Sequence, residues 1–142
     1  MQANNNIGPA CQGEAVTALV VEDEVLIRMV LAERLRDTGF HVLEAANGEE
    51  ARKILGATSG AADVVISDVH MAKPREGLEL AVWMAEHYPE IPVILASGDV
   101  AVVQSDLTGY RNVTDCVPKP YSELEMERLA RARLAARGMS SK

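Results

Sequence analysis

The chain has 142 residues, of which 48% are hydrophobic and 25% are charged, as is ordinary for a single soluble globular domain. Asp and Glu number 21 against 14 Lys and Arg, which gives a formal net charge of −7. Because sequence-independent DNA binding depends on Lys and Arg neutralising phosphates, so acidic a chain is a poor candidate for direct nucleic-acid binding.

The two cysteines, Cys11 and Cys116, match neither a metal-ligand spacing nor a redox pair, and we expect reduced thiols. No apolar run approaches the ~20 residues that span a bilayer. Residues 1–10 have neither a basic nor an apolar segment typical of export signals. The sequence therefore predicts a cytoplasmic protein that does not enter a membrane.

Residues 1–14 have a turn and coil composition without periodicity, and we expect a flexible tail there. One folded domain is expected over residues 15–137, followed by a short tail at 138–142. The chain has no internal repeat and no second predicted core, which leaves no room for another domain.

The first half of the domain predicts two strands, each followed by a helix. Residues 18–21 predict a strand, and the apolar residues after it have the spacing of a core-facing helix that ends at Thr38 and Gly39. That apolar stripe consists of Ile27, Val30, Leu31 and Leu35. A second strand is predicted over 40–45, and Asn47 followed three residues later by Glu50 predicts the start of a second helix.

The second half predicts three more strand and helix pairs. The β-branched run at 63–67 does not alternate, which is typical of a strand covered on both faces, and strands are also predicted at 93–96 and 113–117. The segment 99–107 suits a strand or a helix, and its place between two strands favours a helix. Of the other two helices, one carries an apolar face of Leu80, Ala81, Met84 and Tyr88. The last helix begins at the capping box of Ser122 and Glu125, and its apolar face consists of Met126, Leu129, Ala130 and Leu134.

Five strands alternating with five helices predict an α/β fold with a parallel sheet and helices on both faces. Ligands of such sheets gather beyond the carboxyl ends of the strands, where this chain carries Glu22, Asp23, Asp68, Ser97 and Lys119. Carboxylates held together repel one another unless a cation joins them, and oxygen ligands suit Mg²⁺. A metal-bound carboxylate beside a lysine and a hydroxyl is what phosphoryl transfer to an aspartate requires.

Four motifs, in this order and spacing, resemble the receiver domain of two-component response regulators. They are Val20-Val21-Glu22-Asp23-Glu24, Ile66-Ser67-Asp68, Ala96-Ser97-Gly98 and Val117-Pro118-Lys119-Pro120. The resemblance covers nearly the whole chain, and four ordered motifs are more specific than any one of them. It implies a flavodoxin-like (βα)5 doubly wound sheet with strand order 2-1-3-4-5, and a stand-alone phosphoacceptor switch of a phosphorelay that is not an enzyme.

By this resemblance, Asp68 accepts a phosphoryl group from a sensor histidine kinase or a histidine phosphotransfer protein. Glu22, Asp23, Asp68 and the backbone carbonyl of His70 would hold Mg²⁺. Ser97 would swing towards a phosphoryl oxygen and bond it, and Lys119 would pair with it.

The resemblance also implies a cis bond between Lys119 and Pro120. In the family, phosphorylation reshapes the face built from the fourth helix, the fifth strand and the fifth helix. That face then pairs with itself, giving a homodimer, or with a downstream protein target.

Three positions depart from the family pattern. Ala72 stands where the family usually has proline, which here appears at Pro74, and the loop from Asp68 to Gly77 is one residue longer than the commonest version. The switch position that is often Tyr or Phe is Cys116. A small thiol cannot act as an aromatic rotor, so the output mechanism is expected to differ, and Cys116 is expected to fill a small buried space.

Simpler interpretations stand beside these. Glu22 and Asp23 could cap a helix, Asp68 could cap a strand end, Ser97 could cap the fourth helix and Lys119 could be a solvated turn residue. The whole chain could also be a receiver-like scaffold that binds partners without phosphorylation. An aspartate-nucleophile phosphatase is a further alternative, although its nucleophile would lie in a DxD motif after the first strand rather than the third. A dinucleotide-binding function fails because no G-x-G-x-x-G follows the first strand.

Overall fold

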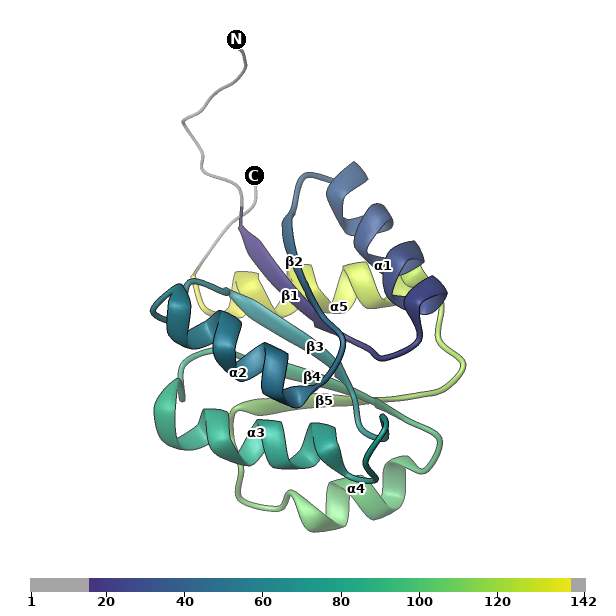
Figure 1. The fold of residues 1–142 in the computed structure, drawn as a ribbon, viewed down its shortest axis with the longest axis vertical. Helices are drawn as coiled ribbons and strands as arrows, with labels where there is room; N and C mark the ends of the chain where they lie inside the picture. Colours follow the sequence, from purple (N-terminus) through teal and green to yellow (C-terminus); the bar gives the residue numbers. More distant parts are fainter. Residues whose placement is uncertain (1–15, 139–142) are drawn as a thin grey trace, which may run out of the picture.

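The computed structural model describes residues 16–138, in which five strands alternate with five helices (Figure 1). The strands are β1 (Thr17–Val21), β2 (His41–Ala45), β3 (Val64–Asp68), β4 (Val93–Ser97) and β5 (Val113–Pro118). The helices are α1 (Val25–Asp37), α2 (Gly48–Ala57), α3 (Glu76–His87), α4 (Val100–Asp106) and α5 (Glu123–Ala136). The tail predicted at 1–14 lies outside the described residues, as does all but Gly138 of the tail predicted at 138–142.

The strands form one parallel sheet in the order β2-β1-β3-β4-β5, which confirms the predicted strand order. The chain winds away from β1 in both directions, so the switch point of the sheet lies between β1 and β3. The parallel register aligns Val21 with Ser67, Asp68 with Ala96, and Ser97 with Pro118. The carboxyl ends of β1, β3, β4 and β5 therefore meet along one edge.

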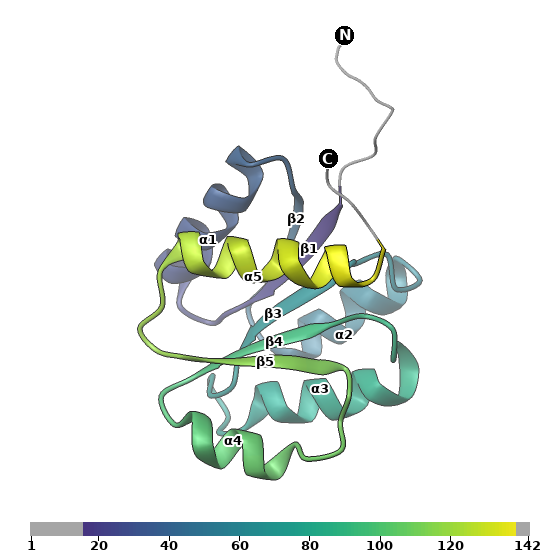
Figure 2. The same ribbon diagram turned by 180° about the vertical axis from the view of Figure 1, so that it is seen from behind.

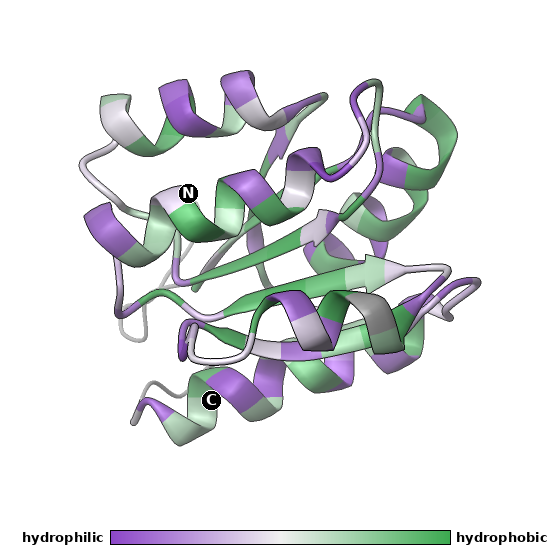
Figure 3. Cartoon of the chain, turned by 90° about the horizontal axis from the view of Figure 1, so that it is seen from below, coloured by the Kyte–Doolittle hydropathy of each residue, from purple (hydrophilic) through white to green (hydrophobic). Residues whose placement is uncertain are grey.

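Helices cover both faces of the sheet. Helices α1 and α5 lie on one face, and α2, α3 and α4 lie on the other (Figures 1 and 2). Two buried clusters result, because alternate residues of β1 point to opposite faces: Leu19 and Val21 into one cluster, Ala18 and Val20 into the other. Figure 3 shows the strands largely hydrophobic, with hydrophilic residues gathered on the surrounding helices and loops. This double coverage explains why the central strands have no polar alternation.

The helix caps predicted from the sequence are formed in the structure. The side chain of Asn47 accepts a hydrogen bond from the Glu50 N–H at 2.8 Å, and Ser122 Oγ accepts one from the Glu125 N–H at 3.0 Å. Gly39 follows α1 with a φ of 104°, the left-handed conformation expected after a helix end. Helix α4 confirms that the segment between β4 and β5 is helical.

The predicted inward stripe of α1 is partly wrong. Leu31 and Leu35 are buried as expected, together with Ala32, but Val30 is 51% exposed. Successive residues of an α-helix are ~100° apart, and the small residue Ala32 rather than Val30 shares the inward side with Leu31. Val30 instead belongs to an exposed apolar patch with Val25, Leu26 and Met29.

Helix α1 is joined to α5 by an ion pair at Glu127, which also pairs with Arg131 of its own helix. Glu127 accepts from Arg34 Nε and from Arg131 Nε, both at 3.0 Å. Burial alone would raise the pKa of Glu127, but the two arginines outweigh burial and hold this pKa below its ordinary value. Arg131 also lies over the ring of Phe40, at 4.7 Å from its centroid. The position of α1 beside α5 is therefore fixed by charge as well as by apolar packing.

Two methionines test how much of the stability comes from the buried side of α3. Met84 is 0% exposed and Met29 is 43% exposed. Met84→Ala leaves a cavity in the core, and we expect it to lower the free energy of unfolding by about 2–5 kcal/mol. Met29→Ala is the matched control and should change it by less than about 1 kcal/mol. Urea denaturation measures both, and equal losses would contradict the described core.

Candidate functional site

Five polar side chains predicted for the site occupy the ends of four strands. Glu22 and Asp23 follow β1, Asp68 ends β3, Ser97 ends β4, and Lys119 follows β5. The register described above brings these ends together, although residues 22 and 119 are far apart in the sequence.

Glu22, Asp23 and Asp68 form a carboxylate cluster in which one oxygen of each lies within 4.8 Å of the others. Glu22 and Asp68 are buried, at 3% and 6% exposure, whereas Asp23 is exposed. Oxygen donors with one side open to solvent suit Mg²⁺ or Ca²⁺, while Zn²⁺ would call for His or Cys ligands. This cluster could hold a hard divalent cation.

The electrostatics of the cluster favour a cation. Burial, and then the charge of Asp68, raise the pKa of Glu22 to about 7 despite a hydrogen bond from the Glu24 N–H. Burial also raises the pKa of Asp68, and Asp23 adds to this rise, while Lys119 opposes it. Glu22 and Asp68 are therefore costly to ionise at this position. A bound cation would remove that cost.

Lys119 supplies the positive charge nearest to the cluster. Its Nζ lies 3.1 Å from Asp68 Oδ2, and its backbone N–H donates to the carbonyl of Ser97 at 2.9 Å. The bond between Lys119 and Pro120 is cis, as predicted. The lysine is thus held at the strand ends by its backbone while its ammonium group contacts the carboxylate.

Ser97 is buried, and its hydroxyl oxygen already has a hydrogen-bond partner. Ser97 Oγ accepts a hydrogen bond from the Asp99 N–H at 3.0 Å, at the entry to α4. The hydroxyl lies at the start of the loop that leads into that helix. A reorientation of Ser97 would therefore change the contact that fixes the start of α4.

The side chain of His70 points into its own loop. Its Nδ1 accepts from the Arg75 N–H at 3.2 Å, and the residue is exposed. This contact agrees with the preference for the backbone carbonyl, rather than the ring, as a metal ligand. The role of that carbonyl stays a prediction.

Sequence reasoning missed Gly77, which holds the start of α3 against the site. A Cβ on Gly77 would lie 2.1 Å from the carbonyl oxygen of Asp68 and 2.9 Å from Val69 Cα. The Gly77 N–H also donates to the Val69 carbonyl at 2.9 Å. Only glycine allows α3 to approach the backbone behind Asp68 so closely, and a glycine in the first turn of a predicted helix was the available signal.

Glu76 was missed as well. This carboxylate is 8% exposed, and its Oε2 accepts from the N–H of Gly48, at the start of α2, at 2.7 Å. It thereby satisfies a free backbone donor at a helix N-terminus and joins α3 to α2. Nothing in the sequence near Glu76, neither the acidic Glu79 nor the long loop before Glu76, indicated that this carboxylate would contact the start of α2.

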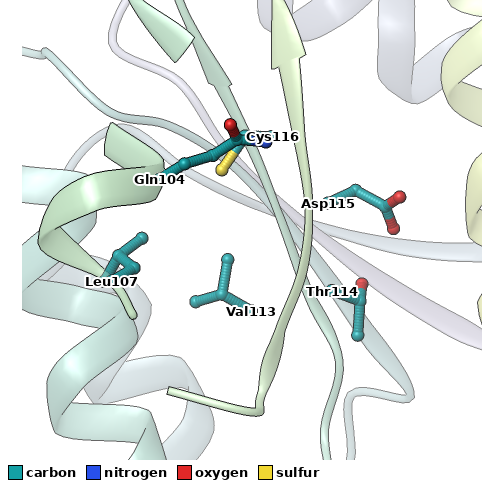
Figure 4. Close-up of a pocket in the computed structure, with 6 residues that line it drawn as sticks. All are labelled: Gln104, Leu107, Val113, Thr114, Asp115 and Cys116. Atoms are coloured by element: carbon teal, nitrogen blue, oxygen red, sulfur yellow. The ribbon is translucent and has the colours of Figure 1, made fainter. Parts of the chain in front are cut away.

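Cys116 does not fill a buried space as predicted. It is half-buried and lines a cavity of about 150 Å³ between α4 and β5, with Gln104, Leu107, Val113, Thr114 and Asp115 around it (Figure 4). Cys116 packs against the edge of the core, and the rest of the space beside it is open. Burial, and then the charge of Asp115, raise the pKa of the Cys116 thiol, which makes it a poor nucleophile at neutral pH.

Comparison with known proteins identifies the family. The model of the response regulator receiver domain matches residues 18–131. The chain belongs to this family. None of the helices described in this receiver domain has the length and hydrophobicity required to cross a membrane.

Among curated proteins, the receiver domain is 38% identical over 84 residues to the sensor kinase CckA of Brucella abortus, covering 59% of this chain and 9% of that protein. It is 37% identical over 119 residues to the probable transcriptional regulator ycf27 of Cyanophora paradoxa, covering 82% and 47%. It is 31% identical over 129 residues to the probable transcriptional regulatory protein TcrX of Mycobacterium tuberculosis, covering 91% and 54%. The receiver domain thus spans about half, or less, of the length of these relatives.

Solved structures match over nearly their full length. A receiver domain from Clostridium thermocellum has a TM-score of 0.77 at 22% identity, covering 87% of this chain and 97% of that one. The receiver domain of the hybrid histidine kinase CckA has a TM-score of 0.69 at 33% identity, covering 83% and 98%. The response regulator TrrA of Thermotoga maritima, in complex with Mg(2+)-BeF, has a TM-score of 0.71 at 32% identity, covering 84% and 99%. These likenesses confirm the predicted flavodoxin-like receiver fold.

Two glycine substitutions test the close approach of α3 to the site. Gly77→Ala places a methyl group against backbone atoms that cannot rotate away, and we expect a loss of about 1–3 kcal/mol in the free energy of unfolding. Gly56→Ala, in α2, meets no atom within 4 Å and should stabilise the protein by up to about 1 kcal/mol. Chemical denaturation distinguishes them, and a tolerated Gly77→Ala would refute the described packing.

Proposed function

We propose that this receiver domain is the phosphoacceptor of a two-component phosphorelay and that Asp68 is the residue phosphorylated. The observation that carries the proposal is the convergence of three carboxylates with Lys119, whose Nζ lies 3.1 Å from Asp68. A carboxylate oxygen of Asp68 attacks the phosphorus of a phosphohistidine in line. A P–O bond forms as the P–N bond breaks, and the imidazole leaves with the electron pair and takes up a proton.

The carboxylate cluster would hold Mg²⁺ through Glu22, Asp23 and Asp68, with the backbone carbonyl of His70 as a further ligand. When bound, Mg²⁺ neutralises charge on the phosphoryl oxygens. Lys119 pairs with another of these oxygens from the side of β5. The receiver acts as a switch rather than as an enzyme, with autophosphorylation from small donors and autodephosphorylation as its own reactions.

Ser97 would report the phosphoryl group to the rest of the fold. Its hydroxyl leaves the Asp99 N–H and donates to a phosphoryl oxygen, which releases the contact at the entry to α4. In place of an aromatic rotor, this chain has Cys116 and the cavity beside it, into which α4 or β5 can settle. The reshaped face of α4, β5 and α5 would bind a downstream protein or a second copy.

The histidine-bearing partner, a sensor kinase or a phosphotransfer protein, would dock on the exposed apolar patch of α1. This patch begins two residues after Asp23 and consists of Val25, Leu26, Met29 and Val30, which are 43–75% exposed. Beside it, Ile27 shares an open groove of about 350 Å³ with Lys119, Pro120, Tyr121 and Glu123. A partner seated there lies next to the proposed acceptor, as phosphoryl transfer requires.

Acetyl phosphate tests the acceptor directly. With Mg²⁺ present, we expect the protein to gain the mass of one phosphoryl group, because acyl phosphates can replace the phosphohistidine as donor. Asp68→Asn should abolish the gain, while Asp37→Asn, an exposed substitution at the far end of α1, should leave it unchanged. No adduct on the wild-type protein would favour the scaffold alternative, and rapid turnover of phosphomonoesters would favour a phosphatase.

The raised pKa of Glu22 makes metal affinity and stability depend on pH. The folded pKa of about 7 exceeds the ordinary 4.5, so without metal the folded state holds this proton more tightly than the unfolded state. The free energy of unfolding therefore falls as pH rises from 4.5 towards 7. A protonated Glu22 cannot bind Mg²⁺, so affinity should rise about tenfold between a pH one unit below this pKa and a pH one unit above it.

Isothermal titration calorimetry measures this dependence. Glu22→Gln is the decisive variant, since it removes the titrating group and should flatten the pH profile while weakening the binding. Asp37→Asn should keep the wild-type slope. A wild-type affinity that does not change over this range would contradict the proposed coupling between Glu22 protonation and metal binding.

A further inference from the structure

A groove lies between α3 and α4, on the face of the sheet opposite α1 and α5. The two helices run beside each other at that face in both ribbon views (Figures 1 and 2). The groove measures about 390 Å³, and its floor consists of Leu78, Val82, Trp83 and Leu107. It shares no residue with the carboxylate cluster or the patch on α1, and it shares only Leu107 with the cavity beside Cys116.

The floor of the groove packs against the apolar core. Leu78 and Leu107 are buried in the core, whereas Val82 and Trp83 remain half-exposed. The indole of Trp83 stacks on His87, with ring centroids 4.4 Å apart and planes inclined by 22°. An aromatic side chain held in this way offers a large apolar surface at little cost in conformational entropy.

The charge along α3 indicates what could cover this floor. Glu79 and Glu86 flank Val82 and Trp83 at positions i, i+3, i+4 and i+7, so all four lie on one side of the helix. Both glutamates are exposed, and the ion pairs found among residues 16–138 include neither of them. They lie two turns apart, about 10.5 Å along the axis.

The single basic residue at the rim does not offset these charges. Arg75, in the loop before α3, pairs with Asp106 of α4 at 2.7 Å. The two charges of that ion pair cancel, so Glu79 and Glu86 leave the rim around the apolar floor net negative. The complementary ligand has an apolar stripe between positive charges.

We propose that the groove between α3 and α4 binds an amphipathic helix of a partner protein that carries Lys or Arg on either side of its apolar stripe. The apolar residues of that helix cover Val82 and Trp83, and its cations pair with Glu79 and Glu86. This binding mode uses anchors at helical spacing seated in an apolar groove. The occupant would touch both the helix that starts behind Asp68 and the helix that follows Ser97.

Trp83 makes the proposal measurable, because it is the only tryptophan of the chain. The probes are two synthetic helical peptides with the same leucine stripe, one flanked by lysines and the other by glutamates. The lysine peptide should shift Trp83 emission to shorter wavelength in a saturable titration, with affinity at least tenfold above that of the glutamate peptide. Equal affinities, or no spectral change at saturation, would overturn the proposal.

Matched variants separate the groove from the general acidity of the chain. The double variant Glu79→Gln with Glu86→Gln should lower the affinity for the lysine peptide at least fivefold. The control Glu33→Gln with Glu90→Gln removes the same charge from exposed sites outside the groove and should change this affinity little. Val82→Lys should abolish binding, and Val30→Lys on α1 should not. Equal losses in the control variants would refute a site between α3 and α4, as would concentration-dependent dimerisation that buries Trp83 without peptide.

Discussion

The structure depends on one electrostatic constraint, which is that Glu22, Asp23 and Asp68 are held together at the edge of an apolar sheet. Two of the three are buried, and burial raises the pKa of both. Such a cluster is unfavourable without compensating positive charge, and within the described residues Lys119 alone contacts Asp68 as a cation. A divalent cation bound here would offset the negative charge of the cluster, and under the proposed function it would also offset the charge of a phosphoryl group on Asp68.

The rest of the fold keeps this arrangement in place and connects it to the surface. The parallel register sets the strand ends side by side, Gly77 lets α3 press on the backbone behind Asp68, and Ser97 links the site to the start of α4. Helix α1 leaves the site on one face of the sheet and exposes an apolar patch. Helices α3 and α4 lie on the other face and border an apolar groove with an acidic rim. A phosphoryl group at Asp68 would thus lie between two surfaces suited to different partners.

Much of this could be predicted from the sequence because the signals are local. The apolar strand runs, the caps at Asn47 and Ser122, and the polar residues at strand ends each depend on a few neighbouring residues. What could not be predicted depends on tertiary packing. Val30 has the periodicity of a core residue but lies opposite Ala32, the close approach at Gly77 involves a strand end nine residues earlier, and the space beside Cys116 is set by the distance between α4 and β5. The partner of Glu76 lies 28 residues away along the chain.

The central claim is that the carboxylate cluster and Lys119 form one site around a divalent cation and a phosphoryl group on Asp68. A crystal structure of the protein with Mg²⁺ and beryllium fluoride, which mimics an aspartyl phosphate, tests it most directly. The account predicts the fluoride complex on a carboxylate oxygen of Asp68, Mg²⁺ among the carboxylates of Glu22, Asp23 and Asp68, and Lys119 and Ser97 on the fluorine atoms. An ordered Mg²⁺ elsewhere on the molecule, with Asp68 unmodified, would contradict it.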